Sequence, residues 1–165
     1  MRRLVGIALL SFFLWSPSAD AGVRVDNRLS FTRPDGSAVP FAHTVRVACG
    51  PWERGVPTRT LHIRVGTAAG PFWALRAVVA DVRRRPVVQF PNAFVWNRPK
   101  GADLFALDGA NELSSGVERA SGRITFQRVR CGRGLAVRFR VRAVLGSEFV
   151  DGESVTVRGR FHLTT

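Results

Sequence analysis

The C-terminal segment LAVRFRVRAVLGSEFVDGESVTVRGRFHLTT, residues 135–165, alternates between apolar and basic side chains. Side chains of a β-strand point alternately to opposite faces, so this period of two predicts two strands with one core face and one basic face. The turn signal Asp151-Gly152 separates the strands and predicts a hairpin. The predicted core face holds Val137, Phe139, Val141, Ala143, Leu145, Val155, Val157, Phe161 and Leu163. The predicted basic face holds Arg138, Arg140, Arg142, Arg158, Arg160 and His162.

The register of this hairpin is constrained because opposed residues must share a face of the sheet. A two-residue turn at Asp151-Gly152 would set Arg142 opposite Phe161 and contradict the alternation. A three-residue loop at 150–152, with Gly152 in the left-handed conformation, keeps both faces consistent. It predicts the pairs Phe139–Leu163, Val141–Phe161, Leu145–Val157, Arg140–His162 and Arg142–Arg160. An additional bulge around Gly146-Ser147 would shift this register.

The rest of the chain after Gly22 shows the same period of two, interrupted at short intervals by Gly or Pro. Strands are expected at 45–47, 61–65, 87–90, 94–96, 104–107 and 124–126. The alternation changes phase between Phe126 and Cys131, which predicts a β-bulge near Gln127-Arg128. The pattern predicts an all-β fold, an antiparallel β-sandwich built as a single domain at 22–165. A closed β-barrel is the alternative.

The segment Phe72–Arg85 fits two secondary structures. A period of two places Trp73 and Ala77 on one face of a strand. Helical spacing instead groups Val79 with Val82, and the basic run at the end of the segment suits a helix C-terminus. Because the neighbouring segments are strands, we expect a strand that turns near its end into the next one.

The N-terminus has the three parts of a secretory signal peptide. Two arginines precede the apolar run Leu4–Trp15, and Ala19-Asp20-Ala21 forms a small-x-small cleavage site. We therefore expect removal of residues 1–21 by cleavage before Gly22. The apolar run is too short to span a bilayer comfortably, and no second long apolar segment follows. The expected product is secreted or periplasmic, with no transmembrane segment after processing.

The two cysteines of the chain, Cys49 and Cys131, form a natural pair in an exported protein. Neither lies in a CxxC motif, so a structural disulfide is the expected state. Closing a loop of this length is worth about 4.5 kcal/mol by the chain-entropy estimate.

The chain is strongly basic, with 25 Lys and Arg against 12 Asp and Glu and a net charge of +13 at pH 7. Of the basic residues 24 are arginines, and Lys100 is the single lysine. A coding bias can exchange lysine for arginine, but it does not remove acidic residues. The charge excess therefore needs a physical explanation.

Two basic clusters are candidate anion-binding sites. The first is the basic face of the C-terminal hairpin, where successive arginines on a strand repeat at about 6.8 Å and offer planar forks to phosphate, sulfate or carboxylate. A solvated face that keeps the protein soluble is the commoner fate of such a run. The second cluster is Arg83, Arg84 and Arg85 on an expected loop, followed by Trp96 in a mixed aromatic and basic stretch. Burial in the core is the commoner fate of Trp96.

The sequence favours a non-enzymatic binding or interaction module with an anionic partner, such as an envelope polymer, a phosphorylated lipid or an acidic protein. The alternative is a small secreted hydrolase whose site forms from loops. The chain contains no GxSxG, HExxH or SxxK motif and no ligand spacing for a metal, and we expect no cofactor. Attraction to nucleic acid would be nonspecific, and nothing in the sequence specifies an oligomeric state.

Overall fold

A computed structural model describes residues 23–40, 44–51, 58–66, 73–91 and 100–165. The predicted signal peptide and Trp96 lie outside the described residues. The described part of the chain forms ten strands and one short helix. They are β1 (Arg24–Thr32), β2 (Val45–Pro51), β3 (Arg59–Val65), β4 (Trp73–Val78), α1 (Val79–Arg84), β5 (Val87–Phe90), β6 (Ala102–Asp108), β7 (Asn111–Ser114), β8 (Ser121–Arg130), β9 (Ala136–Ser147) and β10 (Ser154–Thr164). No helix among them is long and apolar enough to cross a membrane.

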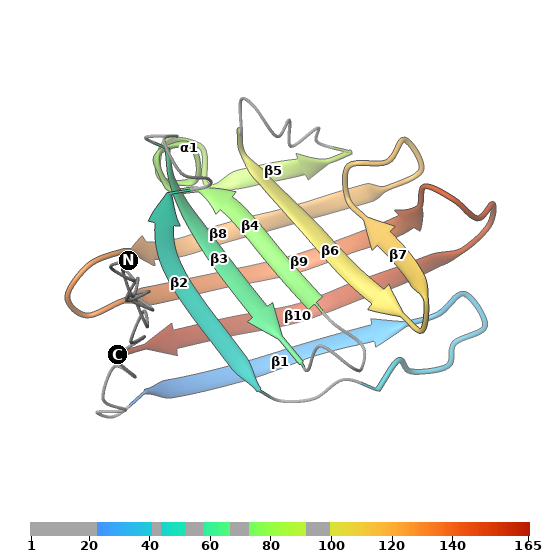
Figure 1. Ribbon diagram of the computed structural model, residues 1–165, viewed down its shortest axis with the longest axis horizontal. Helices are drawn as coiled ribbons and strands as arrows, with labels where there is room; N and C mark the ends of the chain where they lie inside the picture. The colour runs from blue at the N-terminus through green and yellow to red at the C-terminus, as the bar shows by residue number, and fades with distance from the viewer. Residues whose placement is uncertain (1–22, 41–43, 52–57, 67–72, 92–99) are drawn as a thin grey trace, which may run out of the picture.

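The strands form one antiparallel sheet that folds over into two layers and nearly closes into a barrel. Figure 1 shows the front layer, with β2, β3, β4, β6 and β7, running steeply across a back layer that contains β1, β8, β9 and β10. β5 extends the back layer by pairing with β8. Within the described residues β1, β2 and β5 are end strands, each paired with a single neighbouring strand. The all-β antiparallel prediction is confirmed, and the sheet combines the facing layers of a sandwich with the continuity of a barrel.

Two connections join the layers at opposite ends of β9. At the C-terminal end of β9, β7 pairs with it through Leu113–Ser147 and Ser114–Gly146. Near its N-terminal end lies the predicted disulfide, which is present and joins Cys49 on β2 to Cys131 just after β8, with the two Cα atoms 5.8 Å apart.

The core lies between the layers and is filled from both of them. Every second residue of β9 from Val137 to Leu145 is buried, which confirms the predicted core face. Phe139 lies at the centre of an aromatic cluster, with its ring centroid 6.1 Å from Trp73 of the front layer and 5.2 Å from Phe161 of β10. The ring of Phe126 on β8 lies 5.9 Å from Phe139. Large side chains of both layers therefore meet at Phe139.

The hairpin of β9 and β10 has the predicted faces but not the predicted register. Phe139 pairs with Phe161, Leu145 with Val155, Arg140 with Arg160, and Arg142 with Arg158. The predicted pairs Phe139–Leu163, Val141–Phe161, Leu145–Val157, Arg140–His162 and Arg142–Arg160 are wrong by two residues. A slip of two residues preserves which side chains share a face.

The turn explains the error in register. β9 ends at Ser147 and β10 begins at Ser154, so the connection is longer than the three residues expected. The Ser147 N–H donates to the Glu153 carbonyl at 3.1 Å, and the Ser147 hydroxyl accepts from the N–H groups of Phe149 and Val150 at 3.2 and 3.1 Å. Gly152 has the expected positive φ, 83°.

The phase change in β8 is a β-bulge, as predicted. Phe126 pairs with Phe139, and the next pair is Arg128–Arg138, so Gln127 is the extra residue. The bulge lets Phe126 and Val129 both face the core while Arg128 stays outside.

The segment Phe72–Arg85 contains both candidate structures, and its first residue lies outside the described residues. The strand prediction holds for β4 and is wrong after Val78, where α1 begins. Val79 and Val82, one helical turn apart, are both buried, which explains why the helix forms there. Consequently Arg83–Arg85 lie at the C-terminal end of a helix, where their charge suits the helix dipole, and not on the loop we expected.

Gly159 lies in the middle of β10 with φ 136°, and a Cβ there would be 1.9 Å from the carbonyl oxygen of Arg28 on β1. We expect Gly159→Ala to lower the free energy of unfolding by about 1–3 kcal/mol from the backbone conformation, and further because β1 must move. Urea unfolding of the oxidised protein measures the loss. Gly152→Ala is the matched control, since its φ is 83° and nothing lies within 4 Å of its Cβ position. Equal losses for the two variants would contradict the close approach of β1 and β10.

Candidate functional site

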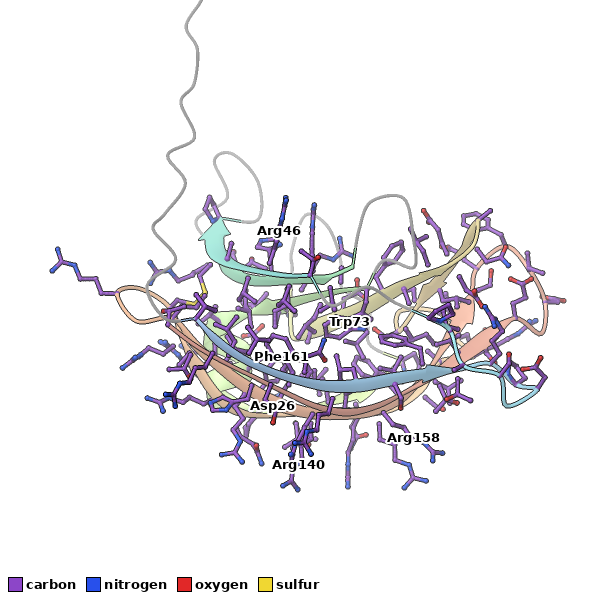
Figure 2. The ribbon with its side chains drawn as sticks, turned by 90° about the horizontal axis from the view of Figure 1, so that it is seen from below. Asp26, Arg46, Trp73, Arg140, Arg158 and Phe161 are labelled. Carbon is purple, nitrogen blue, oxygen red and sulfur yellow. A yellow bond between two sulfur atoms is a disulfide. The ribbon has the colours of Figure 1, made fainter. Side chains whose placement is uncertain are left out.

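The outer surface of the back layer carries the predicted basic residues of the hairpin. Arg138, Arg140, Arg142, Arg158, Arg160 and His162 are all exposed, and all project from the side away from the core. Figure 2 shows Arg140 and Arg158 pointing away from the front layer, on the side opposite Arg46. The alternation of the sequence therefore places all six side chains on one surface.

Strands β1 and β8 extend this surface with arginines that lie outside the predicted basic face of the hairpin. Arg123 and Arg128 of β8 pair with arginines of β9, and Arg28 of β1 pairs with Arg160. Their alternation was readable in the sequence, but the order of strands in the sheet was not. We call the complete set the arginine face. It comprises Arg24, Arg28, Arg123, Arg128, Arg130, Arg138, Arg140, Arg142, Arg158 and Arg160.

The arginines of this face stand in rows across the strands. In one row Arg123, Arg142 and Arg158 are successive register partners on β8, β9 and β10. A second row runs through Arg140 and Arg160 to Arg28. Neighbouring strands lie about 4.8 Å apart, so the side chains of a row are close enough to repel one another. Each directly opposed pair of like charges costs roughly 0.2–1 kcal/mol.

One carboxylate compensates part of the face. Asp26 on β1 accepts from the Arg28 guanidinium at 3.1 Å and lies 3.6 Å from that of Arg160. Among the outward residues described on β1, β8, β9 and β10 it is the one acidic side chain. Within the described part of the chain the row of Arg123, Arg142 and Arg158 has no ion pair. The compensation is therefore confined to the β1 side of the face.

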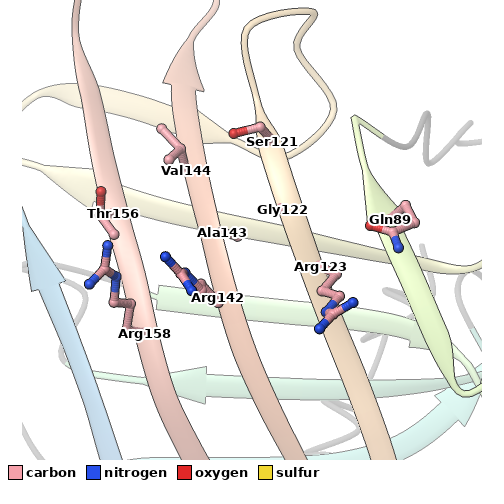
Figure 3. A pocket seen from close by; sticks show the side chains of 9 residues that line it. All are labelled: Gln89, Ser121, Gly122, Arg123, Arg142, Ala143, Val144, Thr156 and Arg158. Carbon is pink, nitrogen blue, oxygen red and sulfur yellow. The ribbon is translucent and has the colours of Figure 1, made fainter.

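A shallow depression lies along the uncompensated row. Its volume is about 410 Å³, and we call it the row hollow. Figure 3 shows Arg158, Arg142 and Arg123 on three neighbouring strands, with Gln89 on β5 next to them. The polar side chains that line the row hollow are Gln89, Ser121, Arg123, Arg142, Thr156 and Arg158.

The second predicted cluster is divided by the structure. Arg83 donates from Nε to the carbonyl oxygen of Val129 at 3.1 Å. Arg84 and Arg85 instead line a second depression of about 440 Å³ together with Lys100, which we call the helix hollow. Trp96, expected beside these cations, lies outside the described residues.

A buried polar cluster lies in the front layer. Ser115 is completely buried, donates from its hydroxyl to Asp103 at 3.0 Å and accepts from the Leu104 N–H at 2.9 Å. Asp103 also forms an ion pair with Arg76. Burial lowers the pKa of His62, and the positive charges of Arg64 and Arg76 lower it further. In the described ranges, no three His, Cys, Asp or Glu side chains gather where they could hold a metal ion.

The arginine face can bind anions by charge and by hydrogen bonding at once. Each guanidinium presents five N–H donors in a planar fork that matches carboxylate and phosphate oxygens. Comparison of the chain with protein-family models, curated proteins and solved structures gives no match. The geometry and charge of the face are accordingly the observations from which a function is proposed.

Proposed function

We propose that this protein is an exported, non-enzymatic binding module that holds an anionic polymer of the cell envelope on its arginine face. The observation that carries the proposal is the accumulation of exposed arginines on four adjacent strands, with Asp26 as the one acidic residue among the described outward positions of these strands. An anionic partner would remove the repulsion between opposed arginines. Binding would also release the counterions that such a surface collects, which adds a salt-dependent gain in affinity.

Export is the second part of the proposal. The signal peptide predicted at 1–21 would deliver the chain to the periplasm or beyond the cell, where it would meet polymers of the cell envelope. The disulfide between Cys49 and Cys131 is compatible with an oxidising compartment of this kind.

Retention on an anionic polymer matrix tests the proposal. We expect the oxidised mature protein to elute at high salt, and the variant Arg140→Ser/Arg142→Ser/Arg160→Ser to elute much earlier. The slope of log affinity against log salt should fall by roughly 0.7–0.9 for each phosphate contact that the substitutions remove. Circular dichroism confirms that both proteins are folded.

The matched control removes the same charge elsewhere. Arg46, Arg59 and Arg133 are exposed and lie on β2, on β3 and in the turn between β8 and β9, outside the arginine face. Arg46→Ser/Arg59→Ser/Arg133→Ser should elute close to the wild type. Equal shifts for the two triple variants would show that the charge is diffuse and would overturn the proposed site.

A further inference from the structure

We infer that the bound polymer carries phosphate groups in its backbone and crosses the strands of the back layer along a track from the row hollow to the helix hollow. This inference rests on the proposed function and deepens it. The track consists of Arg158, Arg142, Arg123, Gln89, Arg84, Arg85 and Lys100.

The first part of the track follows from strand register. Arg158 pairs with Arg142, Arg142 with Arg123, and Arg123 with Gln89, so one line of partners crosses β10, β9, β8 and β5. At about 4.8 Å per strand this line spans roughly 14 Å at right angles to the strands. A linear ligand that follows it meets a new donor at every strand.

The two hollows are neighbours that share Gln89. This residue is part of the lining of each hollow. Beyond Gln89 the helix hollow offers Arg84, Arg85 and Lys100. The two clusters that are far apart in the sequence therefore form one basic path.

Positive charge along the path exceeds the negative charge of the neighbouring carboxylates. The row of Arg123, Arg142 and Arg158 has no ion pair among the described residues. The nearby carboxylate, Asp26, pairs instead with Arg28 and Arg160. In the helix hollow Asp81 is the one acidic lining residue, and it accepts from the Gly101 N–H at 3.0 Å. The helix hollow thus has three positive side chains and one negative side chain, and that carboxylate already accepts a backbone hydrogen bond.

The arrangement of donors favours phosphate over carboxylate. A carboxylate presents two oxygens in one plane, and one arginine fork can engage both of them. A phosphate in a polymer backbone keeps two free oxygens on a tetrahedral phosphorus, and these can accept from arginines on two neighbouring strands at once. Ser121, Thr156 and Gln89 add neutral donors beside the guanidinium groups of the row hollow. No aromatic side chain lines either hollow among the described residues, so the stacking platforms that bind single-stranded nucleic acid are not part of the track.

Calorimetric titration with tripolyphosphate and with long-chain polyphosphate tests the track in the oxidised mature protein. Arg142→Gln should weaken the binding of both probes by roughly tenfold, because the row hollow loses its central fork. Arg84→Gln/Arg85→Gln should weaken the long chain and leave tripolyphosphate unchanged. Arg138→Gln separates the track from the rest of the arginine face, since Arg138 is an exposed arginine of the same strand that lies off the track, and it should weaken both probes less than Arg142→Gln does. Arg142→Lys should keep most of the salt dependence and lose affinity, because it keeps the charge without the fork.

The outcomes separate this inference from the proposed function. If Arg138→Gln weakens both probes as much as Arg142→Gln, the track is wrong and a diffuse polyanion surface stands. Polyglutamate that binds as tightly as polyphosphate of equal charge overturns the assignment to phosphate. Single-stranded oligothymidylate that binds as tightly as polyphosphate overturns the assignment to an envelope polymer in favour of nucleic acid. Absence of binding to any polyanion at physiological ionic strength overturns both proposals.

Discussion

Replacement of Phe139 by alanine is expected to lower the free energy of unfolding by about 3–5 kcal/mol. Phe139 is completely buried and lies between Trp73 of the front layer and Phe161 of β10. Removing its ring creates a cavity where the two layers meet, and the surrounding aromatic side chains are held by both layers and cannot close it. Such a loss is a large part of the 5–15 kcal/mol typical of a folded domain.

Urea unfolding followed by tryptophan fluorescence measures this loss. Phe149→Ala is the matched control, because Phe149 lies in the turn between β9 and β10 with 76% of its surface exposed. That substitution should change stability by less than about 0.5 kcal/mol. A loss below about 1.5 kcal/mol for Phe139→Ala would contradict the packing of the two layers around this ring.

Removal of the disulfide is the second change with a large expected effect. Cys49 and Cys131 are 82 residues apart in the sequence, so Cys49→Ser/Cys131→Ser should cost about 4.5 kcal/mol by the loop-entropy estimate. The bond also joins the two layers near the N-terminal end of β9, whereas the pairing with β7 joins them at its C-terminal end. Without the disulfide the hydrophobic contacts of the core must hold the layers together at the N-terminal end.

Thermal and urea unfolding with and without a thiol reductant measure the contribution of the disulfide. The reductant should lower the stability of the wild type to that of the serine variant and leave the serine variant unchanged. A serine variant within about 1 kcal/mol of the oxidised wild type would show that the bond adds little to the fold.

The faces of the strands were predictable from the sequence, whereas the register was not. Alternation assigned Phe139 to the core and Arg140 to the surface because period two is a local property of the chain. The register depends on the turn, in which Ser147 organises the backbone with its own N–H and hydroxyl. No periodicity encodes those hydrogen bonds. The bulge after Phe126 was predictable because it changes the phase of the alternation itself.

The candidate site was predictable only strand by strand. The sequence identified the arginines of β9 and β10, but it did not show that β8 brings Arg123 beside Arg142 or that Asp26 of β1 compensates Arg160. Those neighbours depend on the order of strands, which is set by tertiary packing. The helix at Val79–Arg84 was missed for a related reason, since burial of Val79 and Val82 decides between two patterns that the segment fits almost equally well.

The end strand β1 has a consequence for the handling of the protein. Within the described residues β1 pairs along its length with β10, and its other edge has a single isolated bridge, Thr32–Ala38, at its C-terminal end. A free strand edge is a template for association with another copy. Arg24 and Arg28 on β1 give approaching copies like charges, so mutual repulsion contributes to colloidal stability. Salt weakens that repulsion, because the screening length falls from about 10 Å at 0.1 M to about 3 Å at 1 M. High-salt buffers that strip polyanionic contaminants from the protein would therefore also remove a barrier to its aggregation.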